Sequence, residues 1–198
     1  MSLKKVIPQD AVLVPDNAEL MFAGVLFDVY QWPQQMYDGT TCTFEMLKRR
    51  DHAHAICIVD DKIIVQDELQ PNSNPRYNFP GGQIDLEDES SLIGAQRETL
   101  EETGYTFKNW RLLRVWQPHG KTENFVYTYL AWDVLDKAQP IDMPGEKITL
   151  NFLDFEEVKQ AVLARKGYLS SEIDIFEKVS SIDDLLQLPE FEGKTVDR

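Results

Sequence analysis

The residues most able to do chemistry are three glutamates gathered between positions 97 and 104. On a helix, residues three and four apart are neighbours, so Glu98, Glu101 and Glu102 lie within one turn. Arg97 can pair with Glu101 at the i,i+4 spacing, which leaves Glu98 and Glu102 without an obvious partner. A ligand set made only of oxygen atoms suits Mg²⁺, with Mn²⁺ as a possible substitute. The spacing therefore indicates either a divalent-metal site or a solvated acidic face of a helix.

The longer segment 82–105 resembles the Nudix box, which favours the metal site. The box is a glycine, five residues, a glutamate, seven residues and then Arg-Glu-U-x-Glu-Glu-x-Gly-U, where U is bulky and apolar. Glu89, followed after seven residues by an arginine and the three glutamates, nearly completes it. Thr99 replaces the first U, and six residues rather than five separate Gly82 from Glu89. The loop therefore holds a one-residue insertion, or Asp88 partly replaces the usual glutamate.

This resemblance assigns roles to the residues of the box. It implies four metal ligands, which are the carbonyl of Gly81 and the carboxylates of Glu98, Glu101 and Glu102. Glu101 is also expected to take part in catalysis. Arg97 is part of the same catalytic motif, and its implied role is structural. It would hold Glu89 and the loop against the helix.

The hydrophobic pattern predicts the elements that position these residues. The box helix spans 90–103, and Gly104 ends it in a left-handed conformation. The expected strands are 21–32 and 42–49 around a turn at Asp38-Gly39, a hairpin over 53–69 around Asp60-Asp61, and later strands at 110–118, 124–135 and 147–155. Two further helices are expected, one over 155–166 with a capping box from Asp154 and Glu157, and a last one capped by Ser171 and Asp174.

These elements predict an α+β fold, and the resemblance makes it a Nudix-type α/β/α sandwich with a mixed β-sheet and an N-terminal β segment. We expect a β-rich segment over 1–50, a hydrolase domain over 51–188 and a loose polar tail over 189–198. Apolar side chains in 20–48 exceed what a small hairpin can bury, and the resembling subgroup exchanges this segment between subunits. A homodimer is therefore expected.

The layout resembles one subgroup in particular, the ADP-ribose and nucleotide-sugar pyrophosphatases. Pro118 and Glu123 match, apart from a missing serine, a proline-glycine stretch of that subgroup, which implies contact with substrate. The subgroup's phosphate-facing arginine is missing, and Arg76 is a candidate to replace it. Aromatic side chains could hold a base, although each could equally be a core residue: Phe27, Tyr30, Trp32, Trp116 and Tyr127.

A further acid outside the box is a candidate catalytic base. Glu146 lies in a loop that contains proline and glycine, just before a strand, and loops of this kind bring reactive side chains to a rigid scaffold. A glutamate at about this distance from the box positions the attacking water in the resembling subgroup. Glu123 and Asp142 are the competing candidates.

The resemblance implies metal-dependent hydrolysis of a pyrophosphate bond in a nucleoside diphosphate linked to another group. ADP-ribose or a nucleotide sugar is the expected substrate, and a nucleoside monophosphate and a sugar phosphate are the expected products. Nucleoside triphosphates, coenzyme A or dinucleoside polyphosphates are alternative substrates. A catalytically inactive Nudix-fold nucleotide sensor is the alternative outside enzymes.

Composition narrows the partners and the compartment. The formal net charge of −14 disfavours nucleic acid and membrane surfaces. No apolar run is long enough to span a bilayer, and the first ten residues lack the apolar core of a secretory signal. Cys42 and Cys57 have no CxxC spacing, so we expect both in the core of a cytoplasmic protein without disulfides.

Overall fold

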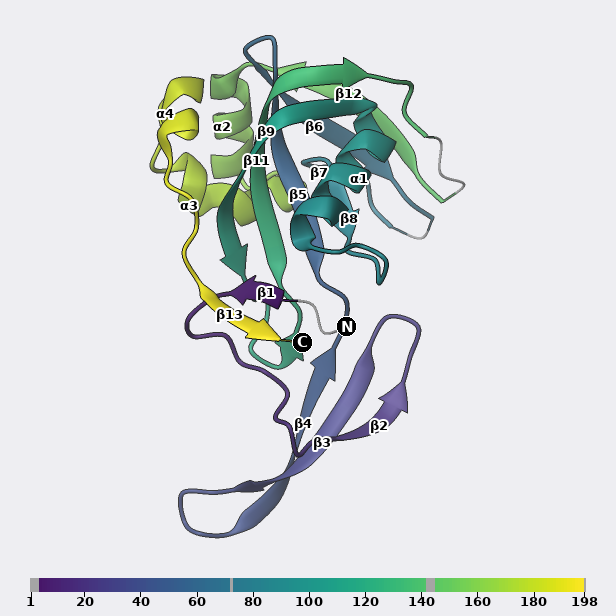
Figure 1. Cartoon of the computed structure of the whole chain (residues 1–198), viewed down its shortest axis with the longest axis vertical. Coiled ribbons are helices and arrows are strands. Elements are labelled where there is room, and N and C mark those ends of the chain that lie inside the picture. Colours follow the sequence, from purple (N-terminus) through teal and green to yellow (C-terminus); the bar gives the residue numbers. More distant parts are fainter. Residues whose placement is uncertain (1–3, 72, 142–144, 198) are drawn as a thin grey trace.

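The computed structural model describes residues 4–71, 73–141 and 145–197. It consists of a main body built on a seven-stranded sheet and a smaller sheet that projects from the body (Figure 1). The large sheet has the order β12-β6-β5-β11-β9, with β7 paired to β6 and β8 to β5. Its strands are β5 (His52–Val59), β6 (Lys62–Leu69), β7 (Arg76–Asn78), β8 (Gly81–Gln83), β9 (Tyr105–Trp116), β11 (Val126–Lys137) and β12 (Lys147–Leu153). The β5–β11 pair is parallel and its neighbours are antiparallel, so the expected mixed sheet is confirmed.

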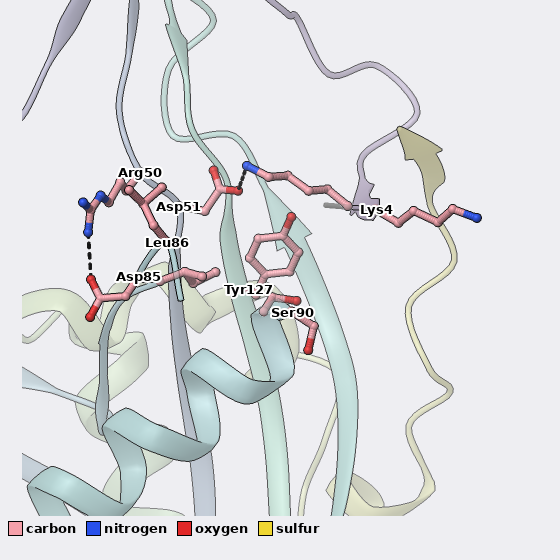
Figure 2. A pocket seen from close by; sticks show the side chains of 10 residues that line it. Lys4, Arg50, Asp51, Asp85, Leu86, Ser90 and Tyr127 are labelled. Carbon is pink, nitrogen blue, oxygen red and sulfur yellow. Dashed lines mark hydrogen bonds and ion pairs between the residues drawn. The ribbon is translucent and has the colours of Figure 1, made fainter. Parts of the chain in front are cut away.

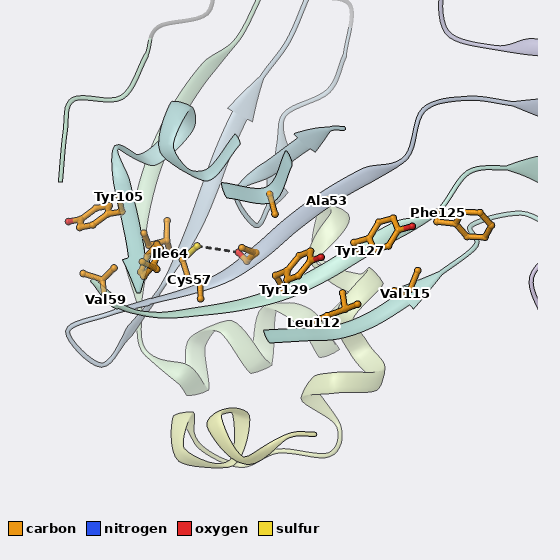
Figure 3. Close-up of a cluster of buried hydrophobic side chains, with 14 of the residues drawn as sticks. Ala53, Cys57, Val59, Ile64, Tyr105, Leu112, Val115, Phe125, Tyr127 and Tyr129 are labelled. Carbon is orange, nitrogen blue, oxygen red and sulfur yellow. Dashed lines mark hydrogen bonds between the residues drawn. The ribbon is translucent and has the colours of Figure 1, made fainter. Parts of the chain in front are cut away.

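Helices cover both faces of this sheet, as expected for an α/β/α sandwich. Helix α1 (Ser91–Thr103) lies on one face, and α2 (Phe155–Leu163), the 3₁₀ helix η1 (Gly167–Glu172) and α3 (Ile173–Phe176) lie on the other (Figure 1). Successive side chains of a strand point to opposite faces. Ala55 and Cys57 of β5 therefore enter the core beneath α1 (Figure 3), whereas Ile56 and Ile58 enter the core beneath α2. The free thiol of Cys42, in contrast, is exposed in the projecting sheet, so its expected core position is wrong.

The helix that carries the glutamates ends at Gly104 as predicted, and its N-cap is Ser90. The Ser90 hydroxyl accepts a hydrogen bond from the amide of Ile93 at the start of α1, and Gly104 ends the helix with φ 76°. Asp154 and Glu157 form the expected capping box of α2, which ends at Leu163 rather than at residue 166.

The prediction of the last helix is wrong, because the segment is not one continuous helix and does not begin at Ser171. The segment after residue 166 is divided into η1, α3 and α4 (Ile182–Gln187). The hydroxyl of Ser171 donates to the Tyr168 carbonyl and to the Glu172 carboxylate instead of capping a helix. Ser181 caps α4 by accepting a hydrogen bond from the amide of Asp184 (3.1 Å).

The projecting sheet has the order β10-β4-β3-β2 and is formed mainly by the N-terminal segment. The segment predicted as one strand over 21–32 forms two antiparallel strands, β2 (Glu19–Ala23) and β3 (Asp28–Gln35). Gly24 makes the reversal between them possible, because a Cβ there would stand 2.4 Å from the carbonyl oxygen of Phe27. A turn that includes Gly39 (φ 84°) joins β3 to β4 (Thr41–Lys48), as predicted, and β10 (Thr122–Glu123) pairs with β4.

The C-terminal tail is ordered, so the prediction of a loose tail over 189–198 is wrong for residues 194–197. Strand β13 (Lys194–Asp197) pairs with β1 (Lys4–Ile7) along all four residues of each strand. Phe191 and Val196 pack against the core beneath α1, which explains why this polar segment is held to the body. Among the described residues, no helix is long and apolar enough to cross a bilayer.

Candidate functional site

The glutamates of α1 lie against the glycine-rich strand β8. Glu102 is only 9% exposed, and its carboxylate accepts hydrogen bonds from the Gln66 side chain (2.8 Å) and the Gly81 amide (2.7 Å). The helical spacing predicted no partner for Glu102, which is wrong because both donors lie on strands, Gln66 on β6 and Gly81 on β8. Burial raises the pKa of Glu102 to about 8, although the hydrogen bonds from Gln66 and Gly81 act in the opposite direction.

Glu98 occupies space that only a glycine leaves open. A Cβ on Gly82 would stand 2.6 Å from the carboxylate carbon of Glu98, so any side chain at this position would displace the carboxylate. Arg97 donates a hydrogen bond of 2.8 Å to Glu98, and burial is the main cause that raises the pKa of Glu98. Gly81 and Gly82 thus bring the backbone directly against Glu98 and Glu102, two of the three glutamates expected to bind metal.

Arg97 ties the loop before α1 to the helix, but through a different acid from the one expected. Its guanidinium donates to both carboxylate oxygens of Asp88 (2.9 and 3.2 Å) and to the Gln83 carbonyl (2.9 Å). It also donates to Glu101 at the predicted i,i+4 spacing (3.2 Å). Asp88 is 4% exposed, whereas Glu89 is exposed. The expected Arg97–Glu89 pair is therefore wrong, and Asp88 takes the place of the usual box glutamate.

Asp88 is also held within its own loop. Its carboxylate also accepts a hydrogen bond from the backbone amide of Asp85 (2.8 Å), which closes the loop on itself. Burial raises the pKa of Asp88, but the hydrogen bonds from Arg97 and Asp85 outweigh burial and hold it below the usual range. Asp88 is therefore a charged partner for Arg97.

Comparison with known proteins agrees with this geometry. The model of the NUDIX domain family matches residues 48–171. The chain belongs to the Nudix family. A solved structure described as an ADP compounds hydrolase is similar to it, with a TM-score of 0.59 and 21% identity over 85% of this chain and 95% of that chain. No curated protein matches the sequence. By family the protein is a Nudix pyrophosphohydrolase, as expected.

The Nudix site extends along one face of β6, which the sequence analysis missed. Gln66, Glu68 and Gln70 alternate along this strand and its end, so their side chains share a face. Gln66 binds Glu102, and the Gln70 side chain donates to the carboxylate of Glu146 (2.8 Å). The negative charge of Glu146 is the smallest of the causes that act on the pKa of Glu102, and it raises that pKa. Asp67 lies between Gln66 and Glu68, so the sequence shows a consecutive polar run and no alternation that could have revealed this row.

The residues fit a divalent cation by the chemistry of their donors. Glu98 and Glu102 present carboxylate oxygens, and Gln66, which binds Glu102, adds a side-chain amide, which suits a hard cation. The side-chain oxygens of Gln66 and Asn78 are buried and accept no hydrogen bond within the described chain. A hydrated cation would satisfy such acceptors. No group of three or more His, Cys, Asp or Glu side chains in the described ranges is already gathered to hold a metal ion, because protein donors hold Glu98 and Glu102.

The other predicted site residues lie apart from the box glutamates. Glu123 is 4% exposed, and its carboxylate accepts from the Val14 amide (2.6 Å) and pairs with Lys48 (2.8 Å). Pro118 is exposed in the turn that leads to β10, and Trp32 lies half-buried in β3. These two contacts of Glu123 lie within the projecting sheet and with the segment that precedes β2, and neither involves α1.

Of the remaining candidates, some are core residues and others lie at the surface. Tyr127 is 1% exposed and is a core residue, whereas Phe27 is 37% exposed and lies 5.3 Å from the Arg49 guanidinium. Asp142, a competing candidate for the base, lies outside the described residues. Arg76 lies at the end of β7, where it stands opposite Glu68.

A separate pocket of about 100 Å³ opens at the other end of α1 (Figure 2). Two ion pairs of 2.8 Å lie at this pocket, Lys5 with Asp51 and Arg50 with Asp85. The glutamates follow in the later turns of α1, so this pocket is distinct from the Nudix site.

Proposed function

We propose that this Nudix enzyme hydrolyses the pyrophosphate bond of a nucleoside diphosphate linked to another group, with ADP-ribose or a nucleotide sugar as substrate. The products are a nucleoside monophosphate and a sugar phosphate. The observation that carries the proposal is the contact of Glu98 and Glu102 with the Gly81-Gly82 backbone. The structural likeness to a protein described as an ADP compounds hydrolase adds support for the substrate class.

Magnesium is the proposed cofactor, with manganese as a substitute. The carboxylates of Glu98, Glu101 and Glu102 and the carbonyl of Gly81 would hold it. When bound, the cation neutralises the diphosphate and makes water a better nucleophile. Arg97 holds Glu98 and Glu101 in place through hydrogen bonds of 2.8 and 3.2 Å. Gln66 orients Glu102 in the same way.

Glu146 is the proposed acceptor of the proton that the attacking water loses. It is half-buried, and the Gln70 amide donates a hydrogen bond to one of its carboxylate oxygens. A general base must lie within hydrogen-bond reach of the water, directly or after a loop closes on the substrate. Measurement of Glu146→Gln at several pH values tests this role. Loss of kcat with unchanged metal affinity supports a base, whereas loss of metal affinity makes Glu146 a ligand.

The projecting sheet is the proposed homodimer interface and the source of further substrate contacts. Leu20, Met21, Phe22, Val25 and Leu26 are each more than half exposed on this sheet and its turn. In a dimer, Trp32 of one copy would contact substrate bound to the other. Pro118 and Glu123 flank β10, which pairs with β4 of the same sheet, so we include them in the substrate-binding region.

A substrate panel tests the reaction. The protein is incubated with ADP-ribose, nucleotide sugars, dinucleoside polyphosphates, coenzyme A and nucleoside triphosphates in the presence of Mg²⁺ or Mn²⁺. We expect a nucleoside monophosphate and a sugar phosphate from the first two classes, and no turnover in excess chelator. Preference for triphosphates, or undiminished turnover in chelator, contradicts the proposal.

A further inference from the structure

A hollow of about 200 Å³ lies at the edge of the large sheet, between the chain before β7 and the start of η1. Polar and aromatic side chains from these two segments line it. They are Ser73, Asn74, Pro75, Arg76, Gly167 and Tyr168. The Nudix box contributes none of these residues, so the hollow is a separate feature that needs its own explanation.

Gly167 fixes one wall of the hollow by a close backbone contact. It adopts φ +52°, and a Cβ there would stand 2.7 Å from the carbonyl oxygen of Tyr77 in β7. Only glycine permits this approach without displacing η1 from β7. The result is that Tyr168, which follows directly, stands at the rim of the hollow with 60% of its surface exposed.

Arg76 forms the opposite wall and has open hydrogen-bond donors. Its guanidinium carbon lies 5.4 Å from the centre of the Tyr168 ring. The nearest carboxylate oxygen, on Glu68, is 4.0 Å away, and within the described residues the guanidinium makes no hydrogen bond. An arginine carries five N–H donors in a fixed plane. Arg76 is therefore held in position by its neighbours while its donors remain available to a ligand.

The hollow adjoins the row of polar residues that ends at the box glutamates. Arg76 stands opposite Glu68, and Asn78 stands opposite Gln66, in the β6–β7 pairing. Gln66 donates directly to Glu102. Two residues of a strand span about 7 Å, so a group attached to a diphosphate at Glu102 can reach Arg76.

We propose that this hollow binds the sugar on the non-nucleoside side of the pyrophosphate. Arg76 and Asn74 donate hydrogen bonds to its hydroxyl groups, the Ser73 hydroxyl oxygen accepts one, and the exposed part of the Tyr168 ring packs against its carbon–hydrogen face. A polar hollow with one aromatic ring suits a hydroxylated group better than a base, because Arg76 already covers the Tyr168 ring. The proposal rests on the proposed function and names the residues that select its leaving group. A site whose donors bind hydroxyl groups rejects a group that lacks them.

Binding of the two product classes tests the proposal. Ribose 5-phosphate, glucose 1-phosphate and AMP are titrated separately into the full chain with Mg²⁺, and binding is followed by nuclear magnetic resonance. Tyr168→Ala and Arg76→Ala are compared with Tyr37→Ala, a matched change at a fully exposed tyrosine in the turn between β3 and β4. We expect about tenfold weaker binding of at least one sugar phosphate in the first two variants, unchanged AMP binding, and no effect of Tyr37→Ala.

Other results overturn the proposal. Unchanged sugar phosphate binding in both variants shows that the hollow is not the sugar site. Weaker AMP binding with unchanged sugar phosphate binding assigns the hollow to the nucleoside instead. Circular dichroism confirms that each variant is folded, which the exposure of Tyr168 makes the expected result.

Failure of the proposed function gives a different pattern. A wild-type protein that cleaves no nucleoside diphosphate compound contradicts the reaction, whatever its affinity for sugar phosphates. A wild-type protein that cleaves ADP-ribose, with kcat/KM unchanged in Tyr168→Ala and Arg76→Ala, retains the reaction and overturns the sugar site.

Discussion

The Nudix site and the projecting sheet place side chains in opposite surroundings. At the site, acids are withdrawn from water, and Glu102 is 9% exposed with two protein donors. On the projecting sheet, apolar side chains face water, with Phe22 62% exposed and Val25 fully exposed. Isolated exposed apolar residues are ordinary, but a contiguous group on one sheet marks an interaction surface.

This difference shows in which of the two regions the side chains find their partners within one chain. Repulsion between the glutamates is offset within the chain, because Arg97, Gln66 and the Gly81 amide supply partners. The apolar surface of the projecting sheet has no such cover from the described chain. The Nudix site is therefore complete within one copy of the chain, whereas the projecting sheet is the proposed contact with a second copy. Substitutions in the two regions should have different consequences.

The largest expected effect is on catalysis. Glu98→Gln removes a charge from the carboxylate that packs against Gly82. We expect kcat to fall by about 100-fold or more, since changes that only disturb the orientation of a metal ligand already cost about 10–100-fold. Glu89→Gln is the matched control, because Glu89 is exposed, and it should retain wild-type kcat. Near-normal activity of Glu98→Gln at saturating Mg²⁺ would remove Glu98 from the ligand set.

The next effect is on stability. Arg97→Ala leaves the buried Asp88 without its main partner, and we expect the free energy of unfolding to fall by about 3 kcal/mol. Denaturant unfolding measures this loss. Asp88→Ala should be similarly destabilising, whereas Glu89→Ala should change stability by less than about 0.5 kcal/mol. A larger loss of stability in Glu89→Ala than in Asp88→Ala would support the Arg97–Glu89 pair that was predicted from the sequence.

Stability should also depend on pH. The folded pKa of Glu102 is about 8, above its ordinary value of 4.5, so between these values the folded state binds more protons than the unfolded state. Stability without metal should therefore fall as pH rises from about 4.5 to about 8 through this residue. Glu102→Gln lacks this dependence, so its melting temperature relative to wild type should increase over the same range in chelator. A constant difference between pH 5 and pH 8.5 would rule out a raised pKa.

The smallest effect on folding is expected in the projecting sheet. Val25→Asp changes a fully exposed side chain, so the stability of a single copy should change by less than about 0.5 kcal/mol. The charge should nevertheless separate the proposed dimer, which sedimentation velocity measures at micromolar concentration. Leu135→Asp, at an exposed position of β11 in the body, is the control and should leave the dimer intact. A wild-type monomer would contradict the proposed interface.

The fold could be predicted where local rules and tertiary packing agree. Ser90 and Gly104 bound α1 as their types indicate, and Asp154 caps α2. The segment over 21–32 failed because a single glycine reverses the chain inside a run that reads as one strand. The last helix failed because Ser171 bonds to nearby groups that the local pattern does not reveal.

The sequence could predict which residues form the site but not which contacts they make. The box pattern located the glutamates, because their spacing on a helix is a local property. It paired Arg97 with Glu89, since spacing alone cannot tell which of two adjacent acids turns inward. The roles of Gln66 and Gln70 depend on strand pairing, which brings distant segments together.

The β1–β13 pair has a consequence for the order in which the molecule folds. Lys4 pairs with Asp197, so closing this small sheet requires nearly the whole chain to be present. Contacts between such distant segments form late, because the entropy of closing the loop is lost before the contact stabilises it. During synthesis, the first strand leaves the ribosome long before its partner exists. The Nudix body therefore folds around an N-terminal segment that is secured last, and a chain stalled before residue 194 would contain the catalytic helix but lack this closing strand.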